Sequence, residues 1–189
     1  YCSTQSVNSA EAGVKLTGVK VDNTDKIDFS QFKWLKQYPQ LANIESNNQT
    51  AVIDKLRTSE SISQLIGPIN NPYGVRDDIL YGIISVVPES QPQLLKIAIK
   101  EAYYRNLGYY SLKSEDKLKY IRLSNLSFHC SYMLGDLDMA DKLLDNLRDK
   151  YRNTDARLNY ISNVEQTTFA WQTLGYGEGE DQRCKRGDY

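Results

Sequence analysis

The sequence predicts an all-α protein, an irregular bundle of helical hairpins, and three observations carry that prediction. Apolar residues recur at helical spacing through most of the chain, as at Leu143 and Leu147. Pro, Gly, Ser and Thr residues stand where such segments begin or end. Over residues 131–151, one amphipathic segment ends, Gly135-Asp136 follows, and a second amphipathic segment begins. This is the pattern of two helices joined by a tight turn.

The N-terminal residues are expected to hold a leader, at most one short strand and one helix. Residues 1–13 are rich in Ser, Asn and Gln, which predicts a flexible leader. Alternation over residues 14–21, broken by a glycine, indicates one short strand with a bulge. Asp28 can cap a helix that runs to about Tyr38, and Pro39 stops it.

Two short helices are predicted next. Thr50 is expected to cap a helix that carries Val52, Ile53 and Leu56 on one side. Ser59 or Ser61 then begins a continuation. A Gly-Pro pair ends that continuation, because proline cannot continue a helix and glycine tolerates the backbone of a helix end.

A strong turn cluster over residues 70–74 suggests where the chain divides. We expect an N-terminal helical subdomain over 14–69 and a helical-hairpin domain over 70–176. The polar residues 177–189 are expected to form an irregular tail.

The pattern of residues 76–87 fits two structures. Asp77 and Asp78 suit the N-terminus of a helix, where the helix dipole favours negative charge. The stretch after them is β-branched, as in a buried strand. The helices predicted on either side favour a helix here as well.

Longer helices complete the prediction. Pro92 suits the first turn of a helix that ends at Gly108. Ser114 is expected to cap the next helix, which the Gly-Asp turn ends. After the second helix of that hairpin, either Asn153 or Thr154 can cap a last helix.

The hairpin resembles a tetratricopeptide repeat over about one repeat, residues 118–151. The resemblance is carried by these residues: Tyr132, Leu134, Gly135, Asp136, Ala140 and Tyr151. It implies that the small Ala140 is buried where the two helices meet, and that a concave groove grips a peptide or partner helix. The Leu-Gly pairs at 107, 134 and 174 do not follow the spacing of a regular array. A degenerate array and a plain hairpin in an irregular bundle therefore both stay open.

Composition and histidine count disfavour several classes of function. The formal net charge is −1, whereas a general binder of nucleic acid normally has a basic surplus. His129 is the single histidine, so one chain cannot build a two-histidine metal site or a histidine-dependent triad. We therefore predict no catalytic residues, no cofactor and no metal site.

The cysteines bear on localisation. Cys2, followed by small polar residues, resembles the start of a mature bacterial lipoprotein, in which that cysteine carries the lipid. The resemblance implies membrane attachment in the cell envelope or periplasm; without it, the chain is expected to be cytoplasmic. Cys130 and Cys184 could pair in an oxidising compartment and would be free thiols in the cytosol.

Tyrosine is unusually frequent, with 14 Tyr against 4 Phe. Either the core uses Tyr where other proteins use Phe, or tyrosines line an interaction surface, since Tyr favours interfaces. The candidates for such a surface lie among Lys and Arg residues, a composition that also suits single-stranded nucleic acid. They are Tyr103, Tyr104, Tyr109, Tyr110 and Tyr120.

These observations predict a non-enzymatic interaction or scaffold subunit that binds another protein or peptide, lipid-anchored through Cys2 in a bacterial envelope assembly. The alternatives are a hydrolase whose carboxylates converge only in the fold, and an adaptor that binds nucleic acid.

Overall fold

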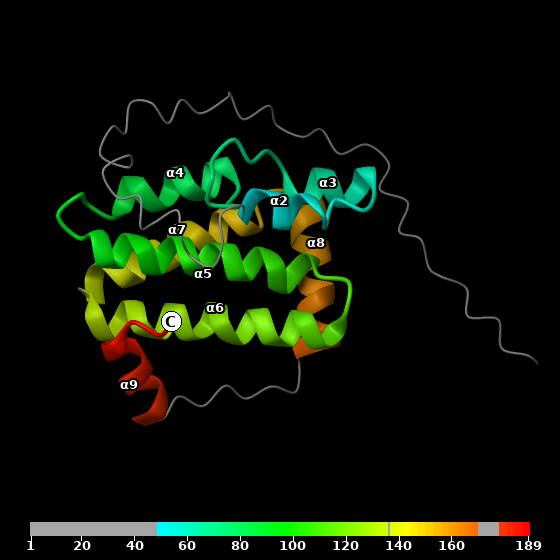
Figure 1. The fold of residues 1–189 in the computed structure, drawn as a ribbon. Helices are drawn as coiled ribbons and strands as arrows, with labels where there is room; N and C mark the ends of the chain where they lie inside the picture. The colour runs from blue at the N-terminus through cyan, green and yellow to red at the C-terminus, as the bar shows by residue number, and fades with distance from the viewer. Residues whose placement is uncertain (1–48, 136, 170–177) are drawn as a thin grey trace, which may run out of the picture.

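The chain folds into a bundle of α-helices, which confirms the predicted fold class (Figure 1). The structure is a computed structural model that describes residues 49–135, 137–169 and 178–189, and it contains no strand within those ranges. The expected strand over 14–21, the expected helix from Asp28 and the residue Cys2 lie outside them. The helices are α2 (Gln49–Asp54), α3 (Glu60–Ile66), α4 (Asp77–Val86), α5 (Pro92–Tyr110), α6 (Ser114–Leu134), α7 (Leu137–Tyr151), α8 (Asp155–Val164), the π-helix η3 (Glu165–Phe169) and α9 (Glu178–Arg186).

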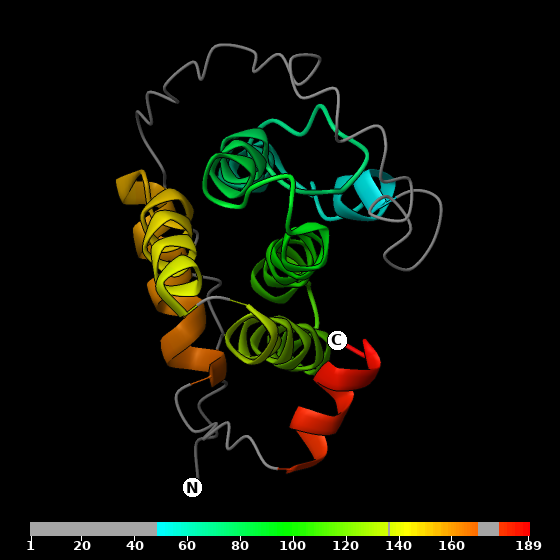
Figure 2. The same cartoon turned by 90° about the vertical axis from the view of Figure 1, so that its left-hand side faces the viewer.

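Helix α5 lies at the centre of the bundle. Seen nearly end-on, α4, α5 and α6 form a stack, with α7 and α8 along one side and α9 beside α6 (Figure 2). Helix α5 packs along α6 and also contacts α3 and α4. Because neighbours cover it on several sides, α5 is buried around most of its circumference.

Helix α7 packs mainly on α4 and only slightly on α6, although α6 and α7 are consecutive. The expected burial of Ala140 is confirmed, since its side chain is 0% exposed. The expected location of Ala140, at the contact between the two helices of the hairpin, is corrected: α7 packs mainly on α4 and not on the preceding helix. Gly82 lets these two helices approach: a Cβ there would lie 2.4 Å from Oδ1 of Asn146 and 2.5 Å from Cε of Lys150.

Gly108 lies inside α5 and does not end it, contrary to the sequence-based expectation. A Cβ at this position would lie 3.0 Å from Cδ1 and 3.2 Å from the backbone nitrogen of Ile121. The glycine therefore serves the close packing of α5 on α6, and the helix continues to Tyr110. Residues 77–86 are helical, which confirms the choice of a helix over a strand.

Several predicted helix ends are confirmed. Ser59 caps α3, because its hydroxyl accepts a hydrogen bond of 3.2 Å from the amide of Ile62. Gly67 follows the last residue of α3 with a φ of 76°, a backbone that glycine adopts without strain. Thr154 caps α8 by accepting a bond of 3.2 Å from the amide of Arg157.

Two predicted caps are wrong. Ser114 is the first residue of α6, and Lys113 occupies the cap position without a side-chain bond. Thr50 lies within α2, and its hydroxyl donates a bond of 2.6 Å to the carbonyl of Asn71. A hydroxyl residue near a helix start therefore has a competing use, as a tether to a neighbouring loop.

Hydrogen bonds from a buried ion pair at the start of α4 connect that helix to the end of α7. The guanidinium of Arg76 donates to the carboxylate of Asp78 at 2.5 Å, and also to the carbonyl oxygen of Lys150. The amide of Asn153 donates to the same carboxylate at 3.1 Å. Arg157 of α8 donates to the carbonyl oxygen of Leu65 at 3.0 Å, so the end of α3 joins this network.

Residues 178–186 form α9, where the sequence analysis expects an irregular polar tail. This helix has almost no apolar residues with which to pack, but a covalent bond attaches it: Cys184 and Cys130 of α6 form a disulfide with an S–S distance of 2.00 Å. Around that bond, Ile97, Leu126 and Tyr189 form a small apolar cluster, separate from the main core.

Candidate functional site: a charged pocket

A pocket of about 190 Å³ lies beside α5 and α6, on the side that α7 and the π-helix cover. Its walls combine charged, phenolic and apolar side chains from four elements and from the connection between α7 and α8. The lining residues are Glu101, Arg105, Tyr109, Phe128, Leu144, Leu147, Arg148, Tyr151, Arg152 and Glu165.

The innermost charges are Glu101 and Arg105, one helical turn apart on α5. The Nε of Arg105 donates to Oε1 of Glu101 at 2.5 Å, and the side chains of Arg105 and Glu101 are only 18% and 5% exposed, respectively. The hydroxyl of Ser124 in α6 donates to the same oxygen at 3.2 Å. The hydroxyl of Tyr151 in α7 donates to the other oxygen at 3.5 Å. Glu101 thus joins three helices.

Burial and the neighbouring carboxylate have opposite effects on the pKa of the Arg105 guanidinium. Burial by itself would lower the pKa of Arg105, but the Glu101 carboxylate raises that pKa well above its usual value. Arg105 therefore stays charged. Its guanidinium also lies 5.6 Å from the ring centre of Tyr151, where the ring face attracts a cation.

A second ion pair lies nearer to the solvent. Nη2 of Arg152 donates to the two carboxylate oxygens of Glu165 at 2.8 and 3.0 Å, and both side chains are 35% exposed. The hydroxyl of Tyr109 donates to Glu165 at 3.0 Å. Glu165 begins the π-helix, a wider turn that is frequent at functional sites because it redirects side chains.

The two tyrosines of the pocket are neutral donors at physiological pH. Burial, more than any neighbouring charge, raises the pKa of Tyr109 and raises that of Tyr151 well above its usual value. Each hydroxyl therefore keeps its proton and donates it in a hydrogen bond to a carboxylate, Glu165 or Glu101.

The carboxylates of the pocket have their acceptors occupied, whereas its arginines keep donors. Each Arg carries several N–H groups in a planar fork. Within the described residues, Arg105 donates from Nε and, at 3.5 Å, from Nη1 to Tyr109. Arg152 donates from Nη2. Among the residues that the structure describes, Arg148 has only a carboxylate oxygen of Asp145 at 3.9 Å, beyond hydrogen-bond length. The pocket thus has a surplus of donors.

This arrangement suits binding better than acid–base chemistry. A general acid or base needs a group that exchanges its proton with a substrate. Glu101 and Glu165 are each held by an arginine and a tyrosine, and neither has an oxygen without a donor. Among the described residues, no group of three or more His, Cys, Asp or Glu side chains is placed to hold a metal ion.

The structure corrects the expected tyrosine surface. Tyr103, Tyr104, Tyr109 and Tyr110 are only 2–4% exposed, because α5 is surrounded by other helices. Their rings pack in the main core; the hydroxyl of Tyr110, for example, donates to the carbonyl of Leu65 at 3.2 Å. Tyr120 is half-buried and stacks on Tyr104. Of the five, only Tyr109 lines the pocket.

Cys130 and Cys184 form a disulfide, the pairing that an oxidising compartment would permit. His129 lies beside them, and its Nε2 is 2.7 Å from Oδ1 of Asp181. The disulfide and this polar contact both connect α6 to α9.

Of the residues that line the pocket, sequence reasoning proposed only Tyr109 as part of an interaction surface. Glu101 and Arg105 carry a detectable signal, since they are opposite charges four residues apart in the helix predicted from Pro92. Glu165 and Arg152 carry none, because a π-helix and an interhelical connection bring them together.

No family model matches the chain, and neither the curated proteins nor the solved structures include a significant match. The described helices include none that is both long and apolar enough to cross a membrane.

Proposed function

We propose that this protein is a non-enzymatic binding subunit that engages another protein or peptide, and that the pocket beside α5 receives a side chain of that partner. The observation that carries the proposal is the surplus of hydrogen-bond donors in a pocket whose two carboxylates are already engaged. Such a site offers recognition by hydrogen bonds and charge, without a group poised for proton transfer.

The size of the pocket supports a side chain as the occupant. Pockets for drug-sized ligands typically measure about 300–1,000 Å³. At about 190 Å³ this pocket is smaller, and it suits a group of a few heavy atoms. Exposed Met133, Leu134 and Leu137 flank the turn between α6 and α7, and grouped apolar side chains of this kind favour contact with a protein.

The rival function is a hydrolase with carboxylates assembled by the fold. Glu101 and Glu165 do line one pocket, as that rival requires. Each already accepts hydrogen bonds from an arginine and a tyrosine, so a substrate would have to displace these donors before proton transfer. The other rival, a nucleic-acid adaptor, needs exposed aromatic rings for stacking, and four of the five candidate tyrosines are buried.

We also propose an oxidising compartment, consistent with a cell-envelope location. The Cys130–Cys184 disulfide supports this, since such bonds persist mainly outside the cytosol. The lipid anchor at Cys2 stays a separate proposal. Its test is membrane fractionation of the Cys2→Ser variant. If the anchor exists, this variant should no longer be found with the membranes.

The function is tested with capped single amino acids that represent acidic, basic, amide, apolar and aromatic side chains. Each N-acetyl amino-acid amide is titrated into the isotope-labelled protein at concentrations on the order of millimolar. We expect at least one to shift the amide signals of residues 101–109 and 148–152. Hydrolysis of ester, amide or glycoside test substrates that disappears in both Glu101→Gln and Glu165→Gln would establish the rival enzyme instead.

A further inference from the structure

Resting on the proposed binding function, we infer that the pocket is a recognition site for a single carboxylate group. The residues that line the pocket carry a net positive charge. Three arginines and two glutamates line the pocket, and three positive charges less two negative ones leave one positive charge among the lining residues. Asp145, whose carboxylate lies 3.9 Å from Arg148, is outside the lining. One monoanion would neutralise that charge. A dianion such as phosphate would bring a second negative charge close to Glu101 and Glu165.

The hydrogen bonds within the pocket also favour a ligand that brings acceptors. Both carboxylates already accept bonds from an arginine and a tyrosine, so a ligand that brought donors would find few acceptors. Arg148 has no partner within hydrogen-bond distance among the described residues, and Arg152 donates from Nη2 alone. The ligand must therefore bring acceptors, and a carboxylate presents two oxygens that match the fork of a guanidinium.

The three arginines of the pocket are placed so that they can surround one carboxylate. Arg148 and Arg152 are four residues apart, so they lie on the same side where α7 ends. Arg105 reaches the pocket from α5, on its inner side. A carboxylate between them would meet exposed guanidinium groups at the opening and the buried, permanently charged Arg105 beneath.

Part of the pocket lining is apolar. Leu144 and Leu147 of α7 and Phe128 of α6 line the same pocket. They provide contacts for a short hydrocarbon stem, which a bare inorganic anion lacks. A glutamate or aspartate side chain and a free short-chain carboxylate share this chemistry, so the experiment compares both sources.

The experiment uses four probes on the isotope-labelled chain: N-acetylglutamate amide, N-acetylglutamine amide, propionate and inorganic phosphate. We expect the glutamate probe to shift pocket signals with a dissociation constant about tenfold or more below that of its neutral glutamine counterpart. Propionate should compete for the same signals, and phosphate should bind more weakly than propionate. Tighter binding of the capped glutamate than of propionate assigns the site to a protein side chain; the reverse order assigns it to a free carboxylate.

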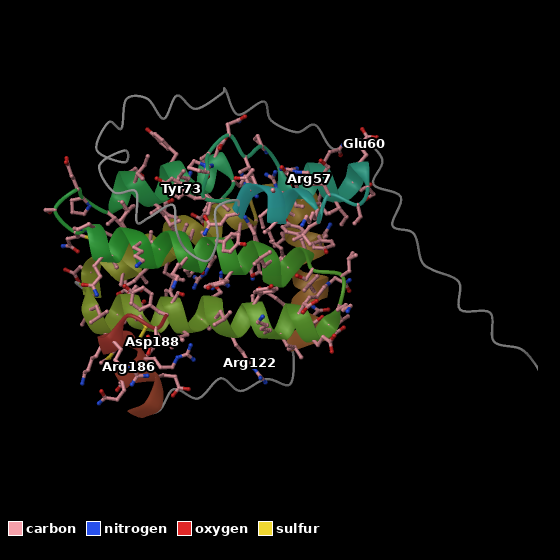
Figure 3. The ribbon with its side chains drawn as sticks, viewed as in Figure 1. Arg57, Glu60, Tyr73, Arg122, Arg186 and Asp188 are labelled. Carbon is pink, nitrogen blue, oxygen red and sulfur yellow. A yellow bond between two sulfur atoms is a disulfide. The ribbon has the colours of Figure 1, made fainter. Side chains whose placement is uncertain are left out.

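Two variants locate the binding. Arg152→Gln and Arg148→Gln should each weaken the glutamate probe about tenfold, because each removes a charged donor. Arg148 is 58% exposed, so its replacement leaves the fold intact and keeps the test decisive even if the other variant unfolds. The matched control is Arg186→Gln: Arg186, the last residue of α9, pairs with Asp188 at 2.7 Å at the surface (Figure 3). Arg186 is not among the residues that line the pocket. This variant should bind the probe unchanged.

Each contrary outcome has a distinct meaning. Equal binding of the glutamate and glutamine probes would overturn the carboxylate inference and leave the binding function standing. Phosphate binding tighter than both carboxylates would overturn the argument from charge. Pocket signals that respond to no capped amino acid of any class would overturn the proposed function together with the inference.

Discussion

Glu101 and Arg105 form an ion pair of 2.5 Å between two turns of α5, the central helix of the bundle. Charges in such a position have lost most of their contact with water, and their mutual attraction only partly repays that cost. Ser124 and Tyr151 add hydrogen bonds to the carboxylate, so the pair is anchored to α6 and α7 as well. The pair therefore connects the stability of the core to the shape of the pocket.

The first prediction concerns one half of this pair. Glu101→Leu should destabilise the fold by about 3 kcal/mol, because it leaves the Arg105 charge buried without its carboxylate. Urea unfolding followed by circular dichroism measures the loss. The double variant Glu101→Leu/Arg105→Met should recover most of it, since an apolar pair replaces the ion pair.

The control for this prediction is Asp188→Ala, which breaks an exposed pair with Arg186. A surface pair of this kind contributes at most about 1 kcal/mol. If Glu101→Leu costs no more than Asp188→Ala, the Glu101–Arg105 pair is not buried as described.

The second prediction concerns alkaline pH. Burial raises the pKa of Tyr110 from 10.0 to about 12 in the folded protein, despite the opposing effect of Arg76. Between these values the folded chain holds a proton that the unfolded chain has released, so the stability is full below pH 10 and falls as the pH rises to about 12. A difference of this size corresponds to a loss of about 3 kcal/mol.

Urea unfolding at a series of alkaline pH values measures this loss, and tyrosinate absorbance reports the ionisation. Tyr110→Phe removes the titrating hydroxyl, and with it the bond to Leu65. That variant should be less stable at neutral pH but should lose less stability above pH 10. The same alkaline loss in both proteins would show that Tyr110 is not the group responsible.

The elements predicted correctly are those whose own residues determine them. Ser59 and Thr154 cap helices through bonds to residues three positions ahead, and Gly67 ends α3 through its backbone. Such signals are local, so the sequence displays them directly.

The failures arise where a partner distant in the sequence decides the outcome. Gly108 has the form of a helix stop, yet its role is to admit Ile121 of α6. The tyrosines of α5 match an exposed aromatic surface in composition, yet the surrounding helices bury them. Helix α9 has almost no apolar residues, and the disulfide to Cys130 holds it in place. The pocket is formed by residues from several helices that are far apart in the sequence. The Glu101–Arg105 spacing is its one signal that the sequence displays.

The third prediction tests the packing of α7. Ala140→Leu should cost about 1–3 kcal/mol, because Ala140 is fully buried and a larger side chain must displace its neighbours. Thermal melting and urea unfolding measure the effect. Lys142→Leu, at an exposed position of the same helix, is the control and should change stability little. An unchanged Ala140→Leu variant would mean that this side of α7 is open.

The fourth prediction concerns the attachment of α9. The disulfide joins Cys130 and Cys184 across a sequence separation of 54 residues, so it restricts the unfolded chain considerably. For a loop of that length, the chain-entropy estimate of its stabilisation is about 4 kcal/mol, and measured values are often lower. Cys130→Ser/Cys184→Ser should therefore lower the free energy of unfolding by about 2–4 kcal/mol. Comparing urea unfolding of this variant with that of the reduced and oxidised parent protein measures the change.

The non-covalent contacts of α9 determine whether the helix stays attached once the disulfide is removed. They include the bond between His129 and Asp181, the position of the Lys100 ammonium over the Tyr189 ring, and the small cluster with Ile97. The side chains of His129 and Asp181 are 19% and 36% exposed, so water can compete for their contact, and α9 should detach while α4 to α8 stay folded. Hydrogen exchange should then be fast in residues 178–189 and unchanged in α5. Equal protection of α9 in the parent and the double variant would show that its polar contacts suffice and that the disulfide adds only to the stability of the folded chain as a whole.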